Sequence, residues 1–200
     1  MCKILVIKNS PRKNSNSELL VNNCLKTIKK EKLDDVNIKI IYPHKLDIGP
    51  CMSCFDCYNN GQCRFKDDMQ PLYDIFNMSD IILVSTPIFF NGLPSHLKAM
   101  IDRCQAIWSS KYISNSSRIN RDKNRRGYLF ATGGAPAYDE QFTAAKLVMS
   151  MFFKVINAEF KEQLLVSNID KKPVKDRQQI LADAQLIGQK IVDEICQQKD

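Results

Sequence analysis

Short apolar runs alternate with longer amphipathic segments along this chain of 200 residues. The short runs are compact or rich in β-branched residues, which is typical of strands buried on both faces of a parallel sheet. Such strands are predicted at residues 3–8, 36–42, 80–85, 127–131 and 160–166. The polar segments between them therefore have to contain the turns and helices that return the chain to the start of the next strand.

Apolar residues recur at helical spacing between the predicted strands. Helices are predicted over residues 20–28, after an N-cap at Asp67 or Asp68, and over residues 93–107, 142–156 and 176–197. This alternation predicts an α/β fold, a doubly wound five-stranded parallel sheet with helices on both faces. No internal repeat, low-complexity tract or linker interrupts the pattern, so a single domain over residues 1–200 is expected.

The net charge of +7 favours anionic partners such as FMN, a dinucleotide, an acidic electron carrier or nucleic acid. A solvated surface rich in lysine explains most of this excess equally well. No zinc-finger, helix-turn-helix or RNA-binding aromatic motif accompanies the charge, so no nucleic acid partner is expected. The N-terminus does not have the pattern of a signal peptide, and no stretch approaches the roughly 20 apolar residues of a membrane span. We therefore expect a cytoplasmic protein without a membrane partner.

Residues 9–17, NSPRKNSNS, follow the first strand and end at a helix N-terminus. Ligands of parallel α/β sheets bind outside the carboxyl ends of the strands, and the free N–H groups of a helix N-terminus attract anions. Ser10 and Ser17 can donate O–H groups to a phosphate, and Asn16 can donate N–H. The alternative is a polar loop whose serine and asparagine side chains only cap the helix.

Two further loops follow the third and fourth strands. Residues 86–94, TPIFFNGLP, are apolar and aromatic, which suits a flat hydrophobic ring whose polar edge meets Asn91. This loop could instead be buried by a neighbouring subunit. In residues 131–138, ATGGAPAY, Gly133 and Gly134 permit a close approach of the backbone to a ligand, or simply a tight turn.

The irregular segment 43–66 carries four closely spaced cysteines, Cys51, Cys54, Cys57 and Cys63. Structural disulfides are not expected in a reducing compartment. Thiolates at such intervals can ligate a 4Fe-4S cluster, as in ferredoxin-type runs. A four-thiolate zinc site and a reversible disulfide between neighbours such as Cys54 and Cys57 remain open alternatives. The other four thiols, those of Cys2, Cys24, Cys104 and Cys196, are expected to be packed or incidental.

Charged side chains outside these loops give weaker indications. His44 and His96 have no partner pattern for nucleophilic catalysis. Asp102 and Arg103 are candidates for a salt-bridged interface pair. The polar segment 109–126 is more typical of a solvated charge run than of a contact to a dinucleotide or an acidic carrier. The basic residues of this segment are Arg118, Arg121, Lys123, Arg125 and Arg126.

The three loops and the cysteine spacing together resemble the NAD(P)H-dependent FMN reductases of the flavodoxin-like fold, and the iron–sulfur flavoproteins in particular. The resemblance extends from Lys3 to about Phe160. The phosphate loop of the family reads Gly-Ser-Pro-Arg-Lys-x-x-Asn-Thr, so Asn9 here replaces a glycine and Ser17 a threonine. The segments IGPCMSCFDCYNNGQCRFKDDM and TPIFFNGLPSHLKAMIDR are similar to the cysteine loop and the flavin-ring loop of that family.

The resemblance implies an FMN-dependent oxidoreductase that receives electrons from NAD(P)H or a ferredoxin and passes them to a carrier or a small acceptor. It implies a 4Fe-4S cluster on Cys51, Cys54, Cys57 and Cys63, and a homodimer or homotetramer. No side chain needs to act as an acid or base, so no catalytic residue is expected. The cofactor-binding residues that it implies are Ser10, Arg12, Asn16, Ser17, Pro87, Ile88, Phe89, Phe90, Asn91, Gly92, Thr132, Gly133 and Gly134.

Two alternatives to this function have different chemistry. The first is a cluster-free NAD(P)H-dependent reductase of FMN or quinones, with two-electron chemistry alone. The second is a zinc-stabilised, non-enzymatic binding module that uses its basic face to hold an acidic partner.

Overall fold

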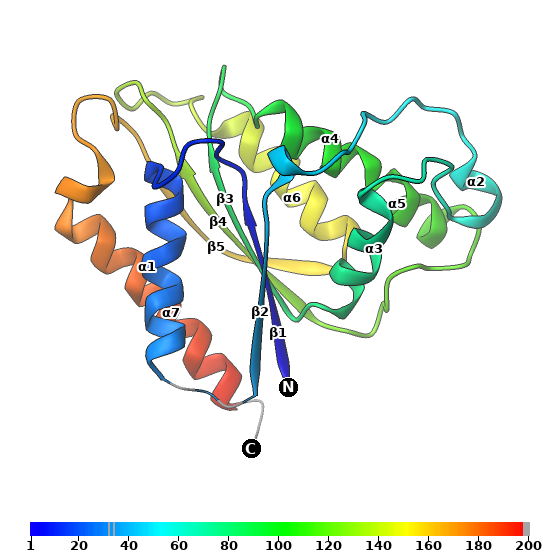
Figure 1. Ribbon diagram of the computed structural model, residues 1–200, viewed down its shortest axis with the longest axis horizontal. Coiled ribbons are helices and arrows are strands. Elements are labelled where there is room, and N and C mark those ends of the chain that lie inside the picture. The colour runs from blue at the N-terminus through cyan, green and yellow to red at the C-terminus, as the bar shows by residue number, and fades with distance from the viewer. Residues whose placement is uncertain (32, 34, 198–200) are drawn as a thin grey trace.

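Within the residues that the computed structural model describes, 1–31, 33 and 35–197, five parallel strands form one sheet in the order β2-β1-β3-β4-β5 (Figure 1). The prediction of a doubly wound parallel α/β sheet is thereby confirmed. The last three residues of the expected domain, 198–200, lie outside the described residues. The strands are β1 (Cys2–Lys8), β2 (Val36–Ile41), β3 (Ile81–Pro87), β4 (Arg125–Thr132) and β5 (Ala158–Val166).

Helices cover both faces of the sheet (Figure 1). One face carries α1 (Asn16–Lys30) and α7 (Gln178–Gln197), which pack directly on each other. Gly188 makes this contact possible, because a Cβ there would lie 2.5 Å from the Cys24 carbonyl oxygen. The other face carries α3 (Met69–Met78), α4 (Ser95–Arg103), α5 (Gln105–Tyr112) and α6 (Thr143–Val155). Shorter turns are η1 (Pro43–Lys45), α2 (Cys57–Asn60) and η2 (Val174–Asp176).

Side chains of the central strands alternate between two apolar cores, one on each face of the sheet. In β1, Leu5 and Ile7 face the core beneath α3 to α6, whereas Ile4 and Val6 face the core beneath α1 and α7. Since both faces are buried, these strands appear in the sequence as continuous apolar runs. The described helices are all too short or too polar to cross a membrane.

The helix predicted over residues 93–107 is two helices, α4 and α5, separated at Cys104. The N–H of Cys104 donates to the Ile101 carbonyl at 2.9 Å, an i→i−3 bond that tightens the last turn of α4. Cys104 is buried, as predicted for a packed thiol, and its sulfur donates to the Met100 carbonyl. The chain then continues as α5 to Tyr112, beyond the predicted end of the helix.

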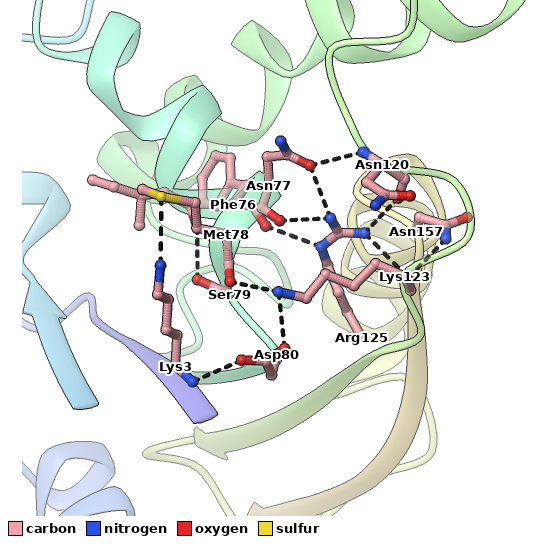
Figure 2. Close-up of polar contacts among 11 residues, drawn as sticks. Lys3, Phe76, Asn77, Met78, Ser79, Asp80, Asn120, Lys123, Arg125 and Asn157 are labelled. Atoms are coloured by element: carbon pink, nitrogen blue, oxygen red, sulfur yellow. Dashed lines mark hydrogen bonds and ion pairs between the residues drawn. The ribbon is translucent and has the colours of Figure 1, made fainter. Parts of the chain in front are cut away.

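The prediction of a solvated charge run is wrong for Arg125 and Arg126, whose exposed fractions are 1% and 7%. Arg125 donates to the carbonyls of Phe76 and Asn77 at the end of α3, at 3.0 and 2.7 Å, and to the Asn120 carbonyl at 2.9 Å (Figure 2). Burial lowers the pKa of Arg125 to about 10, although nearby Asp80 opposes this change. The carbonyls at a helix C-terminus attract a cation, so Arg125 fastens α3 to the start of β4.

Candidate functional site

The carboxyl ends of four strands lie side by side. In the strand registers Lys8 is paired with Ser85, Pro87 with Thr132, and Thr132 with Val166. A cavity of about 470 Å³, here called the rim cavity, lies at this edge and has the size of a small-molecule site. Its walls come from the loops after β1, β3, β4 and β5. The lining residues are Ser10, Pro11, Arg12, Lys13, Asn14, Ser15, Asn16, Ser17, Pro87, Ile88, Phe89, Thr132, Gly134, Ile169 and Asp170.

The loop after β1 is held by the cap of α1. Ser15 is the N-cap residue and accepts the Glu18 N–H at 3.3 Å, while the Glu18 carboxylate accepts the Asn14 N–H at 3.1 Å. The arrangement is close to a capping box, and Lys8 adds an ion pair to Glu18 at 3.0 Å. The first-turn N–H groups of a helix have no partner within the helix, and the helix dipole favours an anion beside them.

The four residues implied for the phosphate lie together in the wall of the rim cavity. Ser10 is largely buried, and its hydroxyl accepts the Arg12 N–H at 3.3 Å, while the Arg12 side chain is exposed. The Asn16 side-chain oxygen accepts the Val174 N–H at 2.7 Å, which leaves its amide N–H groups as donors. Ser17 is fully buried beneath the loop, with its hydroxyl 3.4 Å from that of Ser15.

The loop after β3 forms a tight hairpin. Phe89 and Gly92 exchange backbone hydrogen bonds of 3.0 and 2.9 Å across Phe90 and Asn91. These two residues have φ values of 48° and 61°, as in a type I′ turn. The hairpin leaves Phe90 fully exposed, and Asn91 accepts a hydrogen bond from the Tyr138 hydroxyl. Of the implied ring residues on this loop, Pro87, Ile88 and Phe89 line the rim cavity, whereas Phe90, Asn91 and Gly92 extend from it.

The loop after β4 contributes Thr132 and Gly134 to the rim cavity, while Gly133 is buried and donates to the Val166 carbonyl at 2.9 Å. A Cβ on Gly134 would overlap the carboxylate of Asp170. Sequence reasoning missed Asp170 and its neighbour Ile169, which follow β5. The available signal was topological, because a fifth parallel strand must end at the same edge. The cavity thus holds one carboxylate as well as the cations of Arg12 and Lys13.

A second cavity of about 430 Å³, here called the cysteine cavity, lies between the segment 43–66 and the junction of α4 and α5. Figure 1 shows this segment running beside α4 and α5, with α2 at its outer end. All four clustered cysteines line the cavity. Its lining residues are Cys51, Met52, Ser53, Cys54, Phe55, Cys57, Tyr58, Cys63, Arg64, Phe65, Asp102, Arg103, Gln105 and Ala106.

The four thiols border one cavity without converging on a single point. All cysteines in the described part of the chain are free thiols, and no three His, Cys, Asp or Glu side chains there are grouped to hold a metal ion. Burial raises the pKa of Cys57, and the neighbouring Cys51 and Cys63 thiols raise it further. Ser53 and Phe55, on either side of Cys54, have φ values of 50° and 60°, the left-handed region that backbone N–H nests for anions use. The donor set and backbone therefore fit a thiolate-ligated cluster.

The expected interface pair of Asp102 with Arg103 is wrong, because each has another partner. Asp102 pairs with Lys98 at 2.8 Å on α4. Arg103 is buried and pairs with Asp67 through bonds of 2.6 and 3.0 Å, while a third bond of 3.0 Å reaches the Gly49 carbonyl. Asp67 also accepts the Met69 N–H at 3.1 Å at the start of α3. The pair thus joins the cysteine segment to two helices.

Residues 2–160 match the family model described as NADPH-dependent FMN reductase. Among curated proteins, the chain is similar to an iron-sulfur flavoprotein of Archaeoglobus fulgidus, with 30% identity over 109 residues that cover 54% of each chain. An iron-sulfur flavoprotein of Methanosarcina thermophila is 27% identical over 133 residues, which cover 66% of this chain and 64% of the relative. The chain therefore spans between about half and two thirds of the length of these relatives.

Solved structures share the fold at low sequence identity. An FMN-dependent NADH-azoreductase from Bacillus anthracis in complex with FMN has a TM-score of 0.70 and 14% identity, over 94% of this chain and 99% of that one. An NAD(P)H:quinone oxidoreductase from Methanothermobacter marburgensis has a TM-score of 0.68 and 13% identity, over 94% and 95% of the two chains. The predicted flavodoxin-like fold is thereby confirmed.

Proposed function

The chain belongs to the NADPH-dependent FMN reductase family, and on that premise we propose that it is an FMN-dependent oxidoreductase with a 4Fe-4S cluster. Electrons would enter from NAD(P)H or a ferredoxin and leave to a carrier or to a quinone, nitro or azo acceptor. The observation that carries the proposal is the rim cavity, where the capped N-terminus of α1 and the apolar end of β3 meet.

The rim cavity offers different chemistry to the two ends of FMN. The first turn of α1, with Ser10, Arg12, Asn16 and Ser17, would hold the phosphate and the ribityl chain. The apolar wall of Pro87, Ile88 and Phe89 would contact the ring, with Thr132 and Gly134 at its other edge. Phe90, Asn91, Gly92 and Gly133 would border the ring at the mouth of the cavity.

Bound FMN would supply hydride acceptance and electron release, in steps of one or two electrons. The protein supplies position and electrostatics in this proposal. Backbone N–H groups of the loops after β3 and β4 would stabilise negative charge on the ring, as preorganised donors do elsewhere. No side chain is assigned as a general acid or base.

Cys51, Cys54, Cys57 and Cys63 would hold the cluster, which would add one-electron transfer to the chemistry of the flavin. This part of the proposal is supported by the presence of all four thiols around one cavity and by the names of the curated relatives. We place the protein in the cytoplasm, because a reducing compartment keeps the thiols available for ligation.

We further propose a homodimer or homotetramer with the rim cavity near a subunit contact. Support comes from the large apolar side chains that the described residues expose beside that cavity, namely Phe89, Phe90 and Tyr138. Light scattering of the FMN-loaded protein should give the mass of two or four chains. A mass of one chain would contradict this part of the proposal.

Purification without oxygen, followed by a visible spectrum and assays of flavin, iron and sulfide, tests the function. We expect about one FMN and about four irons and four sulfides per chain, and flavin bleaching on addition of NADPH or NADH. A yellow protein without iron would favour the cluster-free reductase. A colourless protein with one zinc per chain would instead favour the binding module.

A further inference from the structure

The guanidinium of Arg103 is a buried cation at the cysteine cavity. Arg103 ends α4, lines that cavity, and has a side chain with only 1% of its surface exposed. A buried charge is strongly unfavourable unless it is paired and hydrogen-bonded. Asp67 supplies one such partner through two bonds, in the bidentate geometry that suits a guanidinium.

One N–H group of this guanidinium is left without a hydrogen-bond acceptor in the described part of the chain, although both terminal nitrogens are paired. Its two terminal nitrogens donate to the Asp67 carboxylate and to the Gly49 carbonyl. Its Nε–H is buried and has no hydrogen-bond partner among the described residues. Buried donors without a partner are rare in native proteins, and a redox role or a bound ion is one explanation for such a donor.

The surroundings of Arg103 hold it in one place. The ring of Phe65 lies 5.1 Å from the guanidinium carbon, and the Tyr73 hydroxyl donates to the Arg103 carbonyl at 2.9 Å. Cys63 and Arg103 both line the cysteine cavity, so the Cys63 thiol and the guanidinium border the same space.

We propose that Arg103 is a positioning residue for the four-cysteine centre, where its Nε–H donates to sulfur beside Cys63 and its charge favours the reduced form of the cluster. The inference rests on the proposed function, since it requires the cluster. Four thiolates concentrate negative charge, and hydrogen bonds to the sulfurs together with the net charge set the potential of such clusters. Asp67 has the opposite influence, because its carboxylate offsets part of the positive charge.

Redox titrations of the anaerobic holoprotein, followed by electron paramagnetic resonance, test the proposal with three variants. Arg103→Met keeps the length of the side chain without its charge. It should shift the one-electron reduction equilibrium at least tenfold toward the oxidised cluster, which corresponds to about 59 mV.

Arg103→Lys keeps the charge without the directed Nε–H, so its shift should be smaller. Asp67→Asn keeps the shape but removes the opposing charge, so its shift should have the opposite sign. Flavin content should stay at the wild-type value in all three.

The outcomes separate this inference from the proposed function. If Arg103→Met does not fold, because Asp67 is left without its partner, Arg103→Lys and Asp67→Asn still decide the sign of the effect. An iron-loaded Arg103→Met with an unchanged potential would overturn the inference alone. So would a shift of Asp67→Asn in the same direction as Arg103→Lys. Wild-type protein with FMN and no iron would overturn both the inference and the cluster in the proposed function.

Discussion

The rim cavity and the cysteine cavity are similar in volume but are built in different ways. The rim cavity is walled by loops that directly follow hydrogen-bonded strands, together with the strand ends Pro87 and Thr132 and the capped first turn of α1. The cysteine cavity is walled by the segment 43–66, whose regular structure is limited, within the described residues, to η1 and α2. Side-chain contacts hold this segment, chiefly Ser109 to the Cys57 carbonyl and Arg103 to Gly49.

This difference indicates which of the two sites is already formed before its ligand binds. Paired strands and the cap of α1 hold the loops of the rim cavity, so in the proposed function a phosphate would meet donors that are already in place. The cysteine cavity has its thiols around a common space but not grouped for a metal ion. Binding of a metal centre to such a site contributes to folding of the ligand loop. We therefore expect the two sites to respond differently to substitutions.

The largest effect is expected for Cys57→Ser, which removes one thiolate and replaces it with a harder oxygen. The variant should lose essentially all cluster iron, yet keep FMN at the wild-type ratio, because Cys57 is not part of the rim cavity. Iron, sulfide and flavin assays on anaerobic protein measure this. Cys196→Ser is a matched control, since that thiol is exposed on α7 and should affect neither centre. Joint loss of iron and FMN from Cys57→Ser would contradict the independence of the two cavities.

Arg125→Met should destabilise the fold as a whole, because Arg125 fastens the end of α3 to the start of β4 and lines neither cavity. The buried carbonyl of Phe76 and the partly buried bonds to Asn77 and Asn120 would lose a charged donor, at a cost of about 3 kcal/mol. Urea unfolding of the apoprotein gives the change in the free energy of unfolding. Arg121→Met is the control, since Arg121 is exposed and its loss should change stability by less than about 0.5 kcal/mol. Equal effects of the two variants would contradict the structural role of Arg125.

The fold could be predicted because its information is local. A strand buried on both faces must be apolar throughout, as Ile81 to Val84 are in β3. Arg125 and Arg126 escaped prediction because their partners lie far away in sequence, in α3 and at Glu194. The spacing of charges along a segment does not distinguish a solvated arginine from one that is buried by distant carbonyls. The break at Cys104 likewise follows from tertiary packing rather than from hydrophobic period.

The same distinction holds for the candidate site. The phosphate loop is a contiguous motif, so Ser10 to Ser17 were expected at one place and lie at one place. Asp170 could not be recognised from its neighbours, since only the sheet topology brings the loop after β5 to the rim. Arg103 at the end of α4 pairs with Asp67, which precedes α3, whereas the sequence offered Asp102 as the nearer partner.

Ser10→Asp tests the rim cavity alone, without a change at the cysteine cavity. A carboxylate in this largely buried position would face the phosphate of FMN with like charge and would oppose the attraction of the α1 N-terminus. We expect at least a tenfold higher Kd for FMN, equivalent to about 1.4 kcal/mol, with unchanged cluster iron. Fluorescence titration of the apoprotein with FMN measures the affinity. Ser150→Asp adds the same charge to an exposed position of α6 and should leave the Kd unchanged. An unchanged Kd in Ser10→Asp would mean that the phosphate lies elsewhere.

The smallest effect is expected from acid, and it should act on the cysteine segment more than on the rim. Burial alone would raise the pKa of Asp67, but the guanidinium of Arg103 and the Met69 N–H hold it below its ordinary value of 3.8. A lowered pKa in the folded state means that the unfolded chain binds more protons, so this group stabilises the fold above its unfolded pKa. That contribution is lost as the pH falls from near 3.8 through the lower pKa of the folded state.

Urea unfolding of the apoprotein between pH 5 and pH 3 should therefore show a decline in the free energy of unfolding. The decline should be shallower in Asp67→Asn, which has no charge to lose. Ser10 and the backbone amides of α1 do not titrate in this range, so Ser10→Ala should keep the wild-type slope. Identical slopes for Asp67→Asn and wild type would show that the charge of Asp67 does not contribute to holding the cysteine segment.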